Sequence, residues 1–388
     1  MKMFKKVFCL VLVTLLMSTV FTACGNDADD GVWMIGGIGP TTGGAALFGQ
    51  AVYNGAQVAV ERINEMGGIN GYPVELNFQD DTHDAAISVN AYNALKDWGM
   101  QILLGPVTST PAIAVNQEAY ADNLFMITPS ATAIAAIAPP NAFRVCFSDP
   151  DQGRASAGFM HSQGIADTIG ILYDSSCAFS TGIFETFYEV ANDLGLNVPI
   201  VETFTEDSNT DFSVQLQIAR DAGVDLLFLP IYYQEASLIF HQARDIDFAP
   251  IFFGVDGMDG ILGVEGFDPS LADGVMFLAP FASTSPDPAV QEFVAAYKAM
   301  HDGAAPIQFA ANAYDALFIL KQAIEHADLT PDMSVSDISD GLMAAMVEIT
   351  FNGVTMKDGT WAANGEPDKE PMIIQILNGV YYVIYPEY

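Results

Sequence analysis

Basic residues are scarce in this sequence. Its 388 residues include 13 Lys and Arg against 48 Asp and Glu, which gives a formal net charge of −35. Nucleic-acid binding requires a basic stripe and a polybasic membrane patch requires clustered cations, so the composition argues against both. We therefore expect no nucleic-acid partner. The unpaired acids are expected to form a solvated outer surface, with adaptation to high salt as an alternative explanation.

Cysteine is scarce as well, with four in the chain. Cys9 and Cys24 fall in the N-terminal leader described below, which leaves Cys146 and Cys177 in the body. Two cysteines without CxxC spacing are too few for a disulfide scaffold. They could form one disulfide bond or stay as two buried thiols, and we favour the thiols.

The motifs of common enzyme and metal sites are missing too. There is no HExxH, GxSxG or Walker sequence, and Thr42 follows Gly37–Gly39 where a GxGxxG fingerprint needs its third glycine. The five histidines are scattered and are expected to be surface or structural residues. Asp80, Asp81 and Asp84 could hold Ca²⁺, but adjacent acids at a strand end are usually solvated. We expect no enzyme activity, cofactor or metal.

The first residues have the features of a secretory leader. Met1–Lys6 carries three lysines and Val7–Val20 is apolar but shorter than the ~18–20 residues of a membrane-spanning helix. The small residues that follow predict cleavage, which makes residues 1–23 a signal peptide and residues 24–31 a linker.

Cys24 directly follows Thr22-Ala23 and precedes Gly25 and an acidic linker. This segment resembles a bacterial lipoprotein cleavage site, in which Cys24 would become the acylated N-terminus. Ordinary signal-peptide cleavage is the alternative. We expect a protein that is secreted across the cytoplasmic membrane and lipid-anchored to its outer face.

From Val32 onward, short apolar runs alternate with amphipathic stretches, a pattern typical of parallel sheets covered by helices. Two such series predict an α/β fold with two doubly wound lobes. Beyond Pro288 the pattern is mainly helical and ends in a hairpin. The expected strands are 32–39, 74–79, 101–104, 124–127, 168–173, 199–204, 226–230, 251–254, 372–376 and 380–384.

Ligands of open α/β sheets bind where the strands end. The loops at these ends carry hydroxyl and glycine residues, and two of them precede a predicted helix, whose N–H groups favour a carboxylate. These loops are 39–43, 105–110, 129–132, 231–233 and 254–257.

Eight motifs in chain order resemble the type I periplasmic-binding proteins of the leucine/isoleucine/valine-binding family. They are Ile38–Gly43, Ala51–Gly71, Gly105–Ser109, Ser130–Thr132, Phe143–Phe147, Leu229–Tyr233, Gly254–Gly257 and Asn312–Ala316. The resemblance implies a lobe of residues 32–148 and 281–352, a second lobe of 149–280 and 353–388, and a hinge of three crossovers.

The same resemblance implies an extracytoplasmic solute-binding protein of an ABC importer. Such a protein captures an amino acid, here of branched-chain or other apolar type, by hinge closure and delivers it to a membrane permease. We expect it to act as a monomer. A ligand sensor of the same fold and an enzyme on a doubly wound scaffold are alternatives; an adjacent permease gene and ligand turnover would distinguish them.

The polar site residues are implied by matching positions of the family. Ser109 and Thr132 would bind the α-carboxylate of the ligand, with helix capping as their ordinary role. Ser130 would offer its backbone carbonyl to the α-ammonium. Asp256 would bind the same ammonium, although a turn Asp beside Gly commonly serves its own backbone.

The aromatic site residues follow from the same matches. Tyr232 would reach the ligand from the second lobe, with Tyr233 as the alternative. Phe48 would line the side-chain pocket or pack in the core. Phe179 stands where the family often has Tyr, so the pocket wall is expected to be more apolar.

The predicted lipid anchor can be tested by replacing Cys24 with Ser. Without a thiol to acylate, the protein should leave the membrane fraction or fail to be processed, as fractionation and N-terminal mass analysis would measure. Unchanged membrane retention together with normal cleavage would contradict the anchor.

Overall fold

The first series of apolar runs forms a five-stranded parallel sheet. In the computed structural model, which describes residues 31–385, the strand order is β2-β1-β3-β4-β5. The three short strands β3 to β5 are buried on both faces, as a parallel sheet covered by helices requires. The strands are β1 (Trp33–Gly39), β2 (Val74–Asp80), β3 (Ile102–Leu104), β4 (Met126–Thr128) and β5 (Ala142–Arg144).

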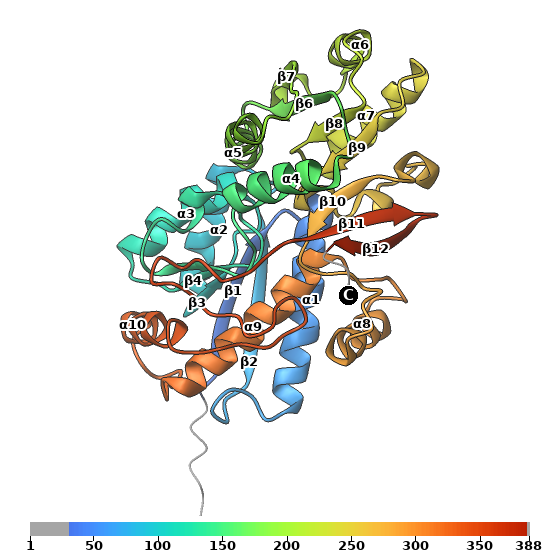
Figure 1. Cartoon of the computed structure of the whole chain (residues 1–388). Coiled ribbons are helices and arrows are strands. Elements are labelled where there is room, and N and C mark those ends of the chain that lie inside the picture. The colour runs from blue at the N-terminus through green and yellow to red at the C-terminus, as the bar shows by residue number, and fades with distance from the viewer. Residues whose placement is uncertain (1–30, 386–388) are drawn as a thin grey trace, which may run out of the picture. The chain divides into compact units, whose positions relative to one another are not determined.

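The second series forms a seven-stranded mixed sheet, ordered β12-β11-β10-β9-β8-β6-β7 (Figure 1). Strands β6 to β10 pair in parallel, and the C-terminal hairpin adds β11 and β12 in antiparallel fashion. The strands are β6 (Ile169–Asp174), β7 (Ile200–Phe204), β8 (Leu226–Leu229), β9 (Ile251–Gly254), β10 (Met276–Ala279), β11 (Met372–Leu377) and β12 (Val380–Tyr385).

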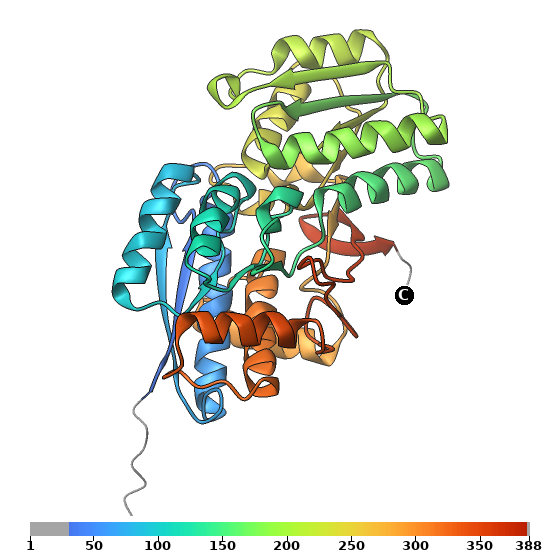
Figure 2. The ribbon, with the colours of Figure 1, turned by 90° about the vertical axis from the view of Figure 1, so that its left-hand side faces the viewer.

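Helices connect the strands and supply the apolar faces that cover them. Near the first sheet, α9 lies along α1 (Figures 1 and 2), and nearly every residue of its first three turns is buried. The helices are α1 (Ala46–Glu65), α2 (Ala85–Trp98), α3 (Ser109–Ala121), α4 (Asp149–Gln163), α5 (Ala178–Leu194), α6 (Ser213–Asp221), α7 (Tyr233–Asp245), α8 (Pro288–Met300), α9 (Gln308–His326) and α10 (Val335–Met346).

The α/β class with two doubly wound sheets is confirmed, but some local predictions were wrong. The short strands β5 and β10 are absent from the expected set. The helix α4 begins at Asp149 because Ser148 forms a capping box with Asp151 at its N-terminus. The bounds of the two lobes stay a prediction.

The predicted signal peptide and Cys24 lie outside the described residues. Across residues 31–385, no helix combines the length and apolar character that crossing a membrane requires.

A buried lysine fixes the chain that leads into β11. Lys369 donates hydrogen bonds to the Val145 carbonyl (3.0 Å), Asn312 Oδ1 (3.0 Å) and Thr355 Oγ1 (2.9 Å). The Thr355 hydroxyl in turn donates to Asp315 at 2.7 Å. Burial lowers the pKa of Lys369 to about 8 and raises that of Asp315. The network joins the end of β5, the helix α9 and the C-terminal segment.

Replacing Lys369 with Met should lower the free energy of unfolding by roughly 3–5 kcal/mol, because Asp315 keeps a buried charge without its cation. Lys357→Met is the control, since Lys357 is exposed and its ion pair with Asp287 lies at the surface. Thermal and denaturant unfolding of both variants would measure the difference. Equal losses of stability in the two variants would contradict the role of the network.

Candidate functional site

The predicted polar residues all lie where parallel strands end. Ser109 begins α3 after β3, and Thr132 follows β4. Tyr232 directly precedes α7 after β8, and Asp256 opens the short 3-10 helix η3 (Asp256–Met258) after β9. Two sheets thus contribute loops to one region, as the rule for open α/β sheets predicts.

Ser109 and Thr132 are brought together by the backbone of the loop after β4. The Ala133 N–H donates to Ser109 Oγ at 3.2 Å. Thr132 is fully buried, and its hydroxyl has no hydrogen-bond partner of ordinary geometry among residues 31–385. Neither residue caps a helix, because Thr108 holds that position for α3 and Ala133 for the next 3-10 turn. The alternative role as helix caps is therefore wrong.

Ser130 uses its side chain to hold the neighbouring loop. Its hydroxyl donates to the Val107 carbonyl at 2.7 Å, and its own N–H faces Thr128 Oγ1 at 3.4 Å. The loops after β3 and β4 are thus fixed to each other at Ser130 as well as at Ser109.

Asp256 is buried at 3 % exposure and is held by its main chain. Its N–H donates to Gln152 Oε1 at 3.0 Å, and its carbonyl accepts from Gln308 Nε2 at 2.9 Å. The carboxyl atom Oδ1 has no partner within the described part of the chain. Burial raises the pKa of Asp256 to about 7.

Asp149 is a second buried carboxyl of the site, and the sequence analysis missed it. Its N–H donates to the Thr132 carbonyl at 2.9 Å, and its Oδ1 also lacks a partner among the described residues. A Cβ on Gly182 would stand 2.8 Å from Asp149 Oδ2, so this glycine of α5 makes room for the carboxyl. Burial raises the pKa of Asp149 well above its ordinary value, and Asp256 raises it further.

Two buried carboxyls near an unpartnered hydroxyl form an electrostatic site for a cation. Each carboxylate is destabilised by loss of water, and their mutual repulsion adds to the cost. A bound ammonium would offset both effects by charge-assisted hydrogen bonds. The closest positive group, Arg144, already has its guanidinium hydrogen-bonded to backbone carbonyls and to Glu366.

The three predicted aromatic residues form one continuous cluster. Tyr232 stacks on Phe179 with ring centroids 4.8 Å apart and meets the edge of Phe48 at 5.2 Å. Phe48 is fully buried and stacks on Phe309 at 4.1 Å. A Cβ on Gly257 would stand 2.9 Å from Tyr232 Cδ1, so the loop of Asp256 lies directly against this cluster.

Tyr232 and Tyr233 have different surroundings. The Tyr233 hydroxyl accepts from the Leu47 N–H at 3.1 Å and its ring meets Phe48 at 4.8 Å, so it ties α7 to α1. Tyr232 instead lines a cavity together with Phe179. The geometry therefore favours Tyr232 over Tyr233 as the residue available to a ligand.

This cavity measures about 260 Å³ and has a polar wall. His83, which the sequence analysis treated as an ordinary histidine, lines it with Nδ1 2.8 Å from Thr108 Oγ1 and its ring 5.7 Å from that of Tyr232. Burial lowers the pKa of His83. Glu235 also lines the cavity, and burial raises its pKa to about 7. A lone histidine in the sequence gives no indication that it lines a cavity.

Asp84 is exposed and Asp80 is half-buried, so the prediction that the acids after β2 are solvated is wrong only for Asp81. Asp80 accepts hydrogen bonds from the Thr41 and Thr82 N–H groups, and Asp84 caps α2. Asp81 is fully buried, and its pKa is raised to about 6 by burial. No cluster of His, Cys, Asp or Glu within residues 31–385 is arranged to hold a metal ion.

Cys146 and Cys177 are free thiols, so the alternative of a disulfide bond between them is wrong in this structure. Cys146 is buried and Cys177 lines the cavity beside Tyr232. Burial raises the pKa of each thiol to about 12, which keeps both uncharged.

Residues 33–379 match the family model described as periplasmic binding protein. The chain belongs to the periplasmic binding protein family. It is 31 % identical over 328 residues to the Leu/Ile/Val-binding protein BraC3 of Rhizobium johnstonii, covering 82 % of this chain and 86 % of the relative. It is 30 % identical to Leu/Ile/Val-binding protein homolog 3 of Brucella melitensis, over 77 % of this chain and 80 % of the relative.

Two solved periplasmic binding proteins share the fold over 90 % of this chain and 97 % of theirs. One is the leucine-binding protein LivK of Thermotoga maritima, with 28 % identity and a TM-score of 0.80. The other is LivJ of Streptococcus pneumoniae in complex with isoleucine, with 26 % identity and a TM-score of 0.81. Membership of this family confirms the prediction of a binding protein rather than an enzyme.

The buried charge of Asp256 predicts that this binding protein gains stability when the charge is removed. The folded state raises the pKa of Asp256 from 3.8 to about 7, so it holds the proton more tightly than the unfolded chain. Stability is therefore lost as the pH rises from about 4 through 7. Ligand-free Asp256→Asn should exceed wild type in unfolding free energy by up to about 4 kcal/mol at pH 8, and by little at pH 4.

Denaturant unfolding across this pH range would measure the effect. Asp97→Asn serves as the control because Asp97 is exposed. A difference between wild type and Asp256→Asn that does not change with pH would show that Asp256 is not a buried charge.

Proposed function

We propose that this chain is the extracytoplasmic substrate-binding protein of an ABC importer and that its ligand is a branched-chain amino acid. Family membership supports the role of binding protein, and the names of the relatives support the ligand class. The observation that carries the proposal is the juxtaposition of two buried carboxyls, Asp149 and Asp256, with the aromatic cluster of Phe48, Phe179 and Tyr232; in each carboxyl Oδ1 lacks a hydrogen-bond partner among residues 31–385.

The polar half of the site complements the common part of every amino acid. Ser109 at the start of α3 and the Thr132 loop would bind the α-carboxylate through hydroxyl and N–H donors. Asp256, Asp149 and the Ser130 carbonyl would bind the α-ammonium. The Thr132 hydroxyl lies beside Asp149, where burial raises the pKa of that carboxyl and hydrogen bonding by the hydroxyl lowers it in part, so the groups proposed for the two ends of the amino acid are adjacent.

The aromatic half fits an apolar side chain. Phe179 lines the cavity with its ring, and burying a leucine-sized side chain against such a wall is favourable by about 1.5–3 kcal/mol. Phe48 and Phe309 are buried and stack on each other, so they support this wall from the core. Tyr232 adds a hydroxyl beside Phe179. A charged side chain would lose water here without gaining a partner on the ring faces.

The remaining steps of transport follow from the proposed role. We propose that lobes of residues 32–148 with 281–352 and 149–280 with 353–388 close around the ligand by hinge motion. The closed monomer would then dock on permease subunits in the membrane. Acylation at Cys24 would keep the protein at the outer face of the membrane.

The direct test is mass spectrometry of ligand released from purified protein, followed by calorimetry with a panel of amino acids. Leucine, isoleucine or valine should bind most tightly. Tight binding of a charged amino acid with no response to these three would overturn the ligand class, and catalytic turnover of any bound compound would revive the enzyme alternative.

Asp256→Asn should weaken binding of the cognate amino acid, because it removes the charge facing the ammonium and keeps the side-chain shape. Losing one partner of a buried charge pair costs roughly 2–5 kcal/mol, or about 1.5 to 3.5 decades in dissociation constant. Calorimetric titration would measure the loss. Affinity within about threefold of wild type would remove Asp256 from the site.

Asp259→Asn is a matched control for this experiment. Asp259 is similarly buried, its pKa is also raised to about 7, and its Oδ1 also lacks a partner among residues 31–385, but its Oδ2 accepts from the Gln308 N–H at 2.8 Å at the start of α9. Asp259→Asn should alter stability and leave affinity within about threefold of wild type.

Affinity of the wild type should also fall as the pH drops below about 7, because protons compete with the ammonium for Asp256.

A further inference from the structure

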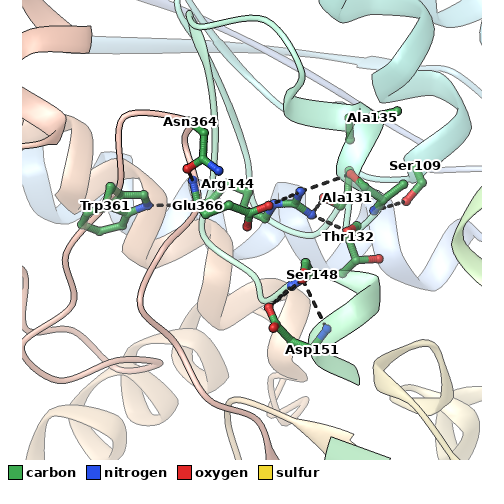
Figure 3. A network of polar contacts seen from close by, with 12 residues as sticks. Ser109, Ala131, Thr132, Ala135, Arg144, Ser148, Asp151, Trp361, Asn364 and Glu366 are labelled. Carbon is green, nitrogen blue, oxygen red and sulfur yellow. Dashed lines mark hydrogen bonds and ion pairs between the residues drawn. The ribbon is translucent and has the colours of Figure 1, made fainter. Parts of the chain in front are cut away.

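Arg144, at the end of β5, places its side chain under the loop that carries Thr132. Its guanidinium donates hydrogen bonds to the carbonyls of three consecutive residues, Ala131 (3.2 Å), Thr132 and Ala133 (3.2 Å). Figure 3 shows the guanidinium between this loop and Glu366, which accepts at 3.0 Å. The Arg144 side chain is fully buried, so its bonds to the three carbonyls are made away from water, whereas Glu366 is partly exposed.

The backbone of Arg144 is itself anchored by the C-terminal segment. Trp361 Nε1 donates to the Arg144 carbonyl at 2.8 Å, and the Arg144 N–H donates to the Gly365 carbonyl at 3.2 Å. Gly365 has φ +81°, and a Cβ there would stand 2.3 Å from the Ala142 carbonyl oxygen. Only glycine permits the segment to approach β5 this closely.

Three carbonyls that turn toward Arg144 fix the orientation of the peptide planes in the loop. The Ala133 N–H then reaches Ser109 Oγ, and the Thr132 carbonyl also receives the Asp149 N–H. The one cation therefore orients the backbone that joins Ser109, Thr132 and Asp149. A lysine could not reproduce this arrangement, because its ammonium is a point charge without the planar fork of donors.

We propose that Arg144, supported by Glu366, is a positioning residue for amino-acid binding that acts through the Ala131–Ala133 backbone. The proposal rests on the proposed function of the site. At metal sites, groups that orient a binding residue from behind change affinity by about 10- to 100-fold when they are replaced, and we expect an effect on the same scale here.

The test compares Arg144→Lys with Asn141→Ala. Asn141, at the other end of β5, is equally buried and donates to two carbonyls, those of Ala119 (3.0 Å) and Leu124 (2.7 Å). Both variants should melt at lower temperature than wild type. Calorimetry with leucine should give a dissociation constant about 10- to 100-fold higher for Arg144→Lys and within threefold of wild type for Asn141→Ala.

Hydrogen exchange of the ligand-free proteins provides a readout that does not depend on the ligand. The N–H groups of Ala131 and Ala133 are hydrogen-bonded, so their exchange reports the order of the loop. Arg144→Lys should speed their exchange at least tenfold relative to Asn141→Ala. If wild type binds no branched-chain amino acid, the proposed function fails, while this exchange still decides the role of Arg144.

Glu366→Gln keeps the guanidinium–carbonyl bonds and removes the balancing charge. It should change exchange and affinity in the same direction as Arg144→Lys but less, and it replaces that variant if Arg144→Lys does not fold. The proposal would be overturned if Arg144→Lys had the same loop exchange and affinity as the Asn141→Ala control. It would also be overturned if Glu366→Gln had the same loop exchange and affinity as wild type.

Discussion

The burial of Asp149 and Asp256 without a cation of their own is the constraint around which the site is arranged. Both carboxyls are nearly inaccessible, and burial raises the pKa of each. A fold that maximised its own stability would replace such groups by neutral ones, since an unpaired buried charge is costly. Their presence is understandable when a ligand supplies the missing positive charge, so stability and binding make opposite demands on the same atoms.

The scaffold must therefore hold these groups in place while they are unfavourable. It does so mainly through backbone contacts. Gln152 and Gln308 are hydrogen-bonded to the main chain of Asp256, and the Thr132 carbonyl accepts a hydrogen bond from the Asp149 N–H. These contacts fix the two main chains while Oδ1 of each carboxyl keeps no partner within residues 31–385, which is the preorganisation that tight binding requires.

The basic residues near the site are used as internal supports and not as ligands. Arg144 binds backbone carbonyls, and Lys369 binds Val145, Asn312 and Thr355. In a chain with so few cations, two buried ones at the junction of β5, α9 and the C-terminal segment are notable. They hold together parts of the chain that are more than 200 residues apart in sequence.

Much of this could be predicted from local sequence patterns. Apolar runs and amphipathic stretches gave most strands and helices because each is long enough for its periodicity to be visible. The strand β5 was missed because its three residues include Arg144 and so form no apolar run. The strand β10 is an apolar run as long as β8 and β9, so its length does not explain why it was missed. The loops at the strand ends were identified because parallel sheets bring them to one edge, which is a rule of topology rather than of sequence.

Single residues whose role depends on distant partners could not be predicted. Asp149 follows Ser148 and precedes Pro150, a context that belongs to a helix start, and its place beside Thr132 arises from folding alone. Arg144 and Glu366 are far apart in the chain, and no sequence pattern indicates that they form an ion pair.

Selectivity poses a different problem, because the site has two kinds of wall. Phe179 and Tyr232 line the cavity with stacked rings, whereas His83 and Glu235 line it with polar groups. Phe48 and Phe309 are buried and stack on each other, so they support these rings rather than face a ligand. An apolar side chain that ends against Phe179 would leave the polar groups of the cavity hydrated. The proposed limit on ligand length therefore lies at Tyr232, whose ring contacts Phe179 and Phe48, while the two carboxyls would act on the ammonium that all amino acids share.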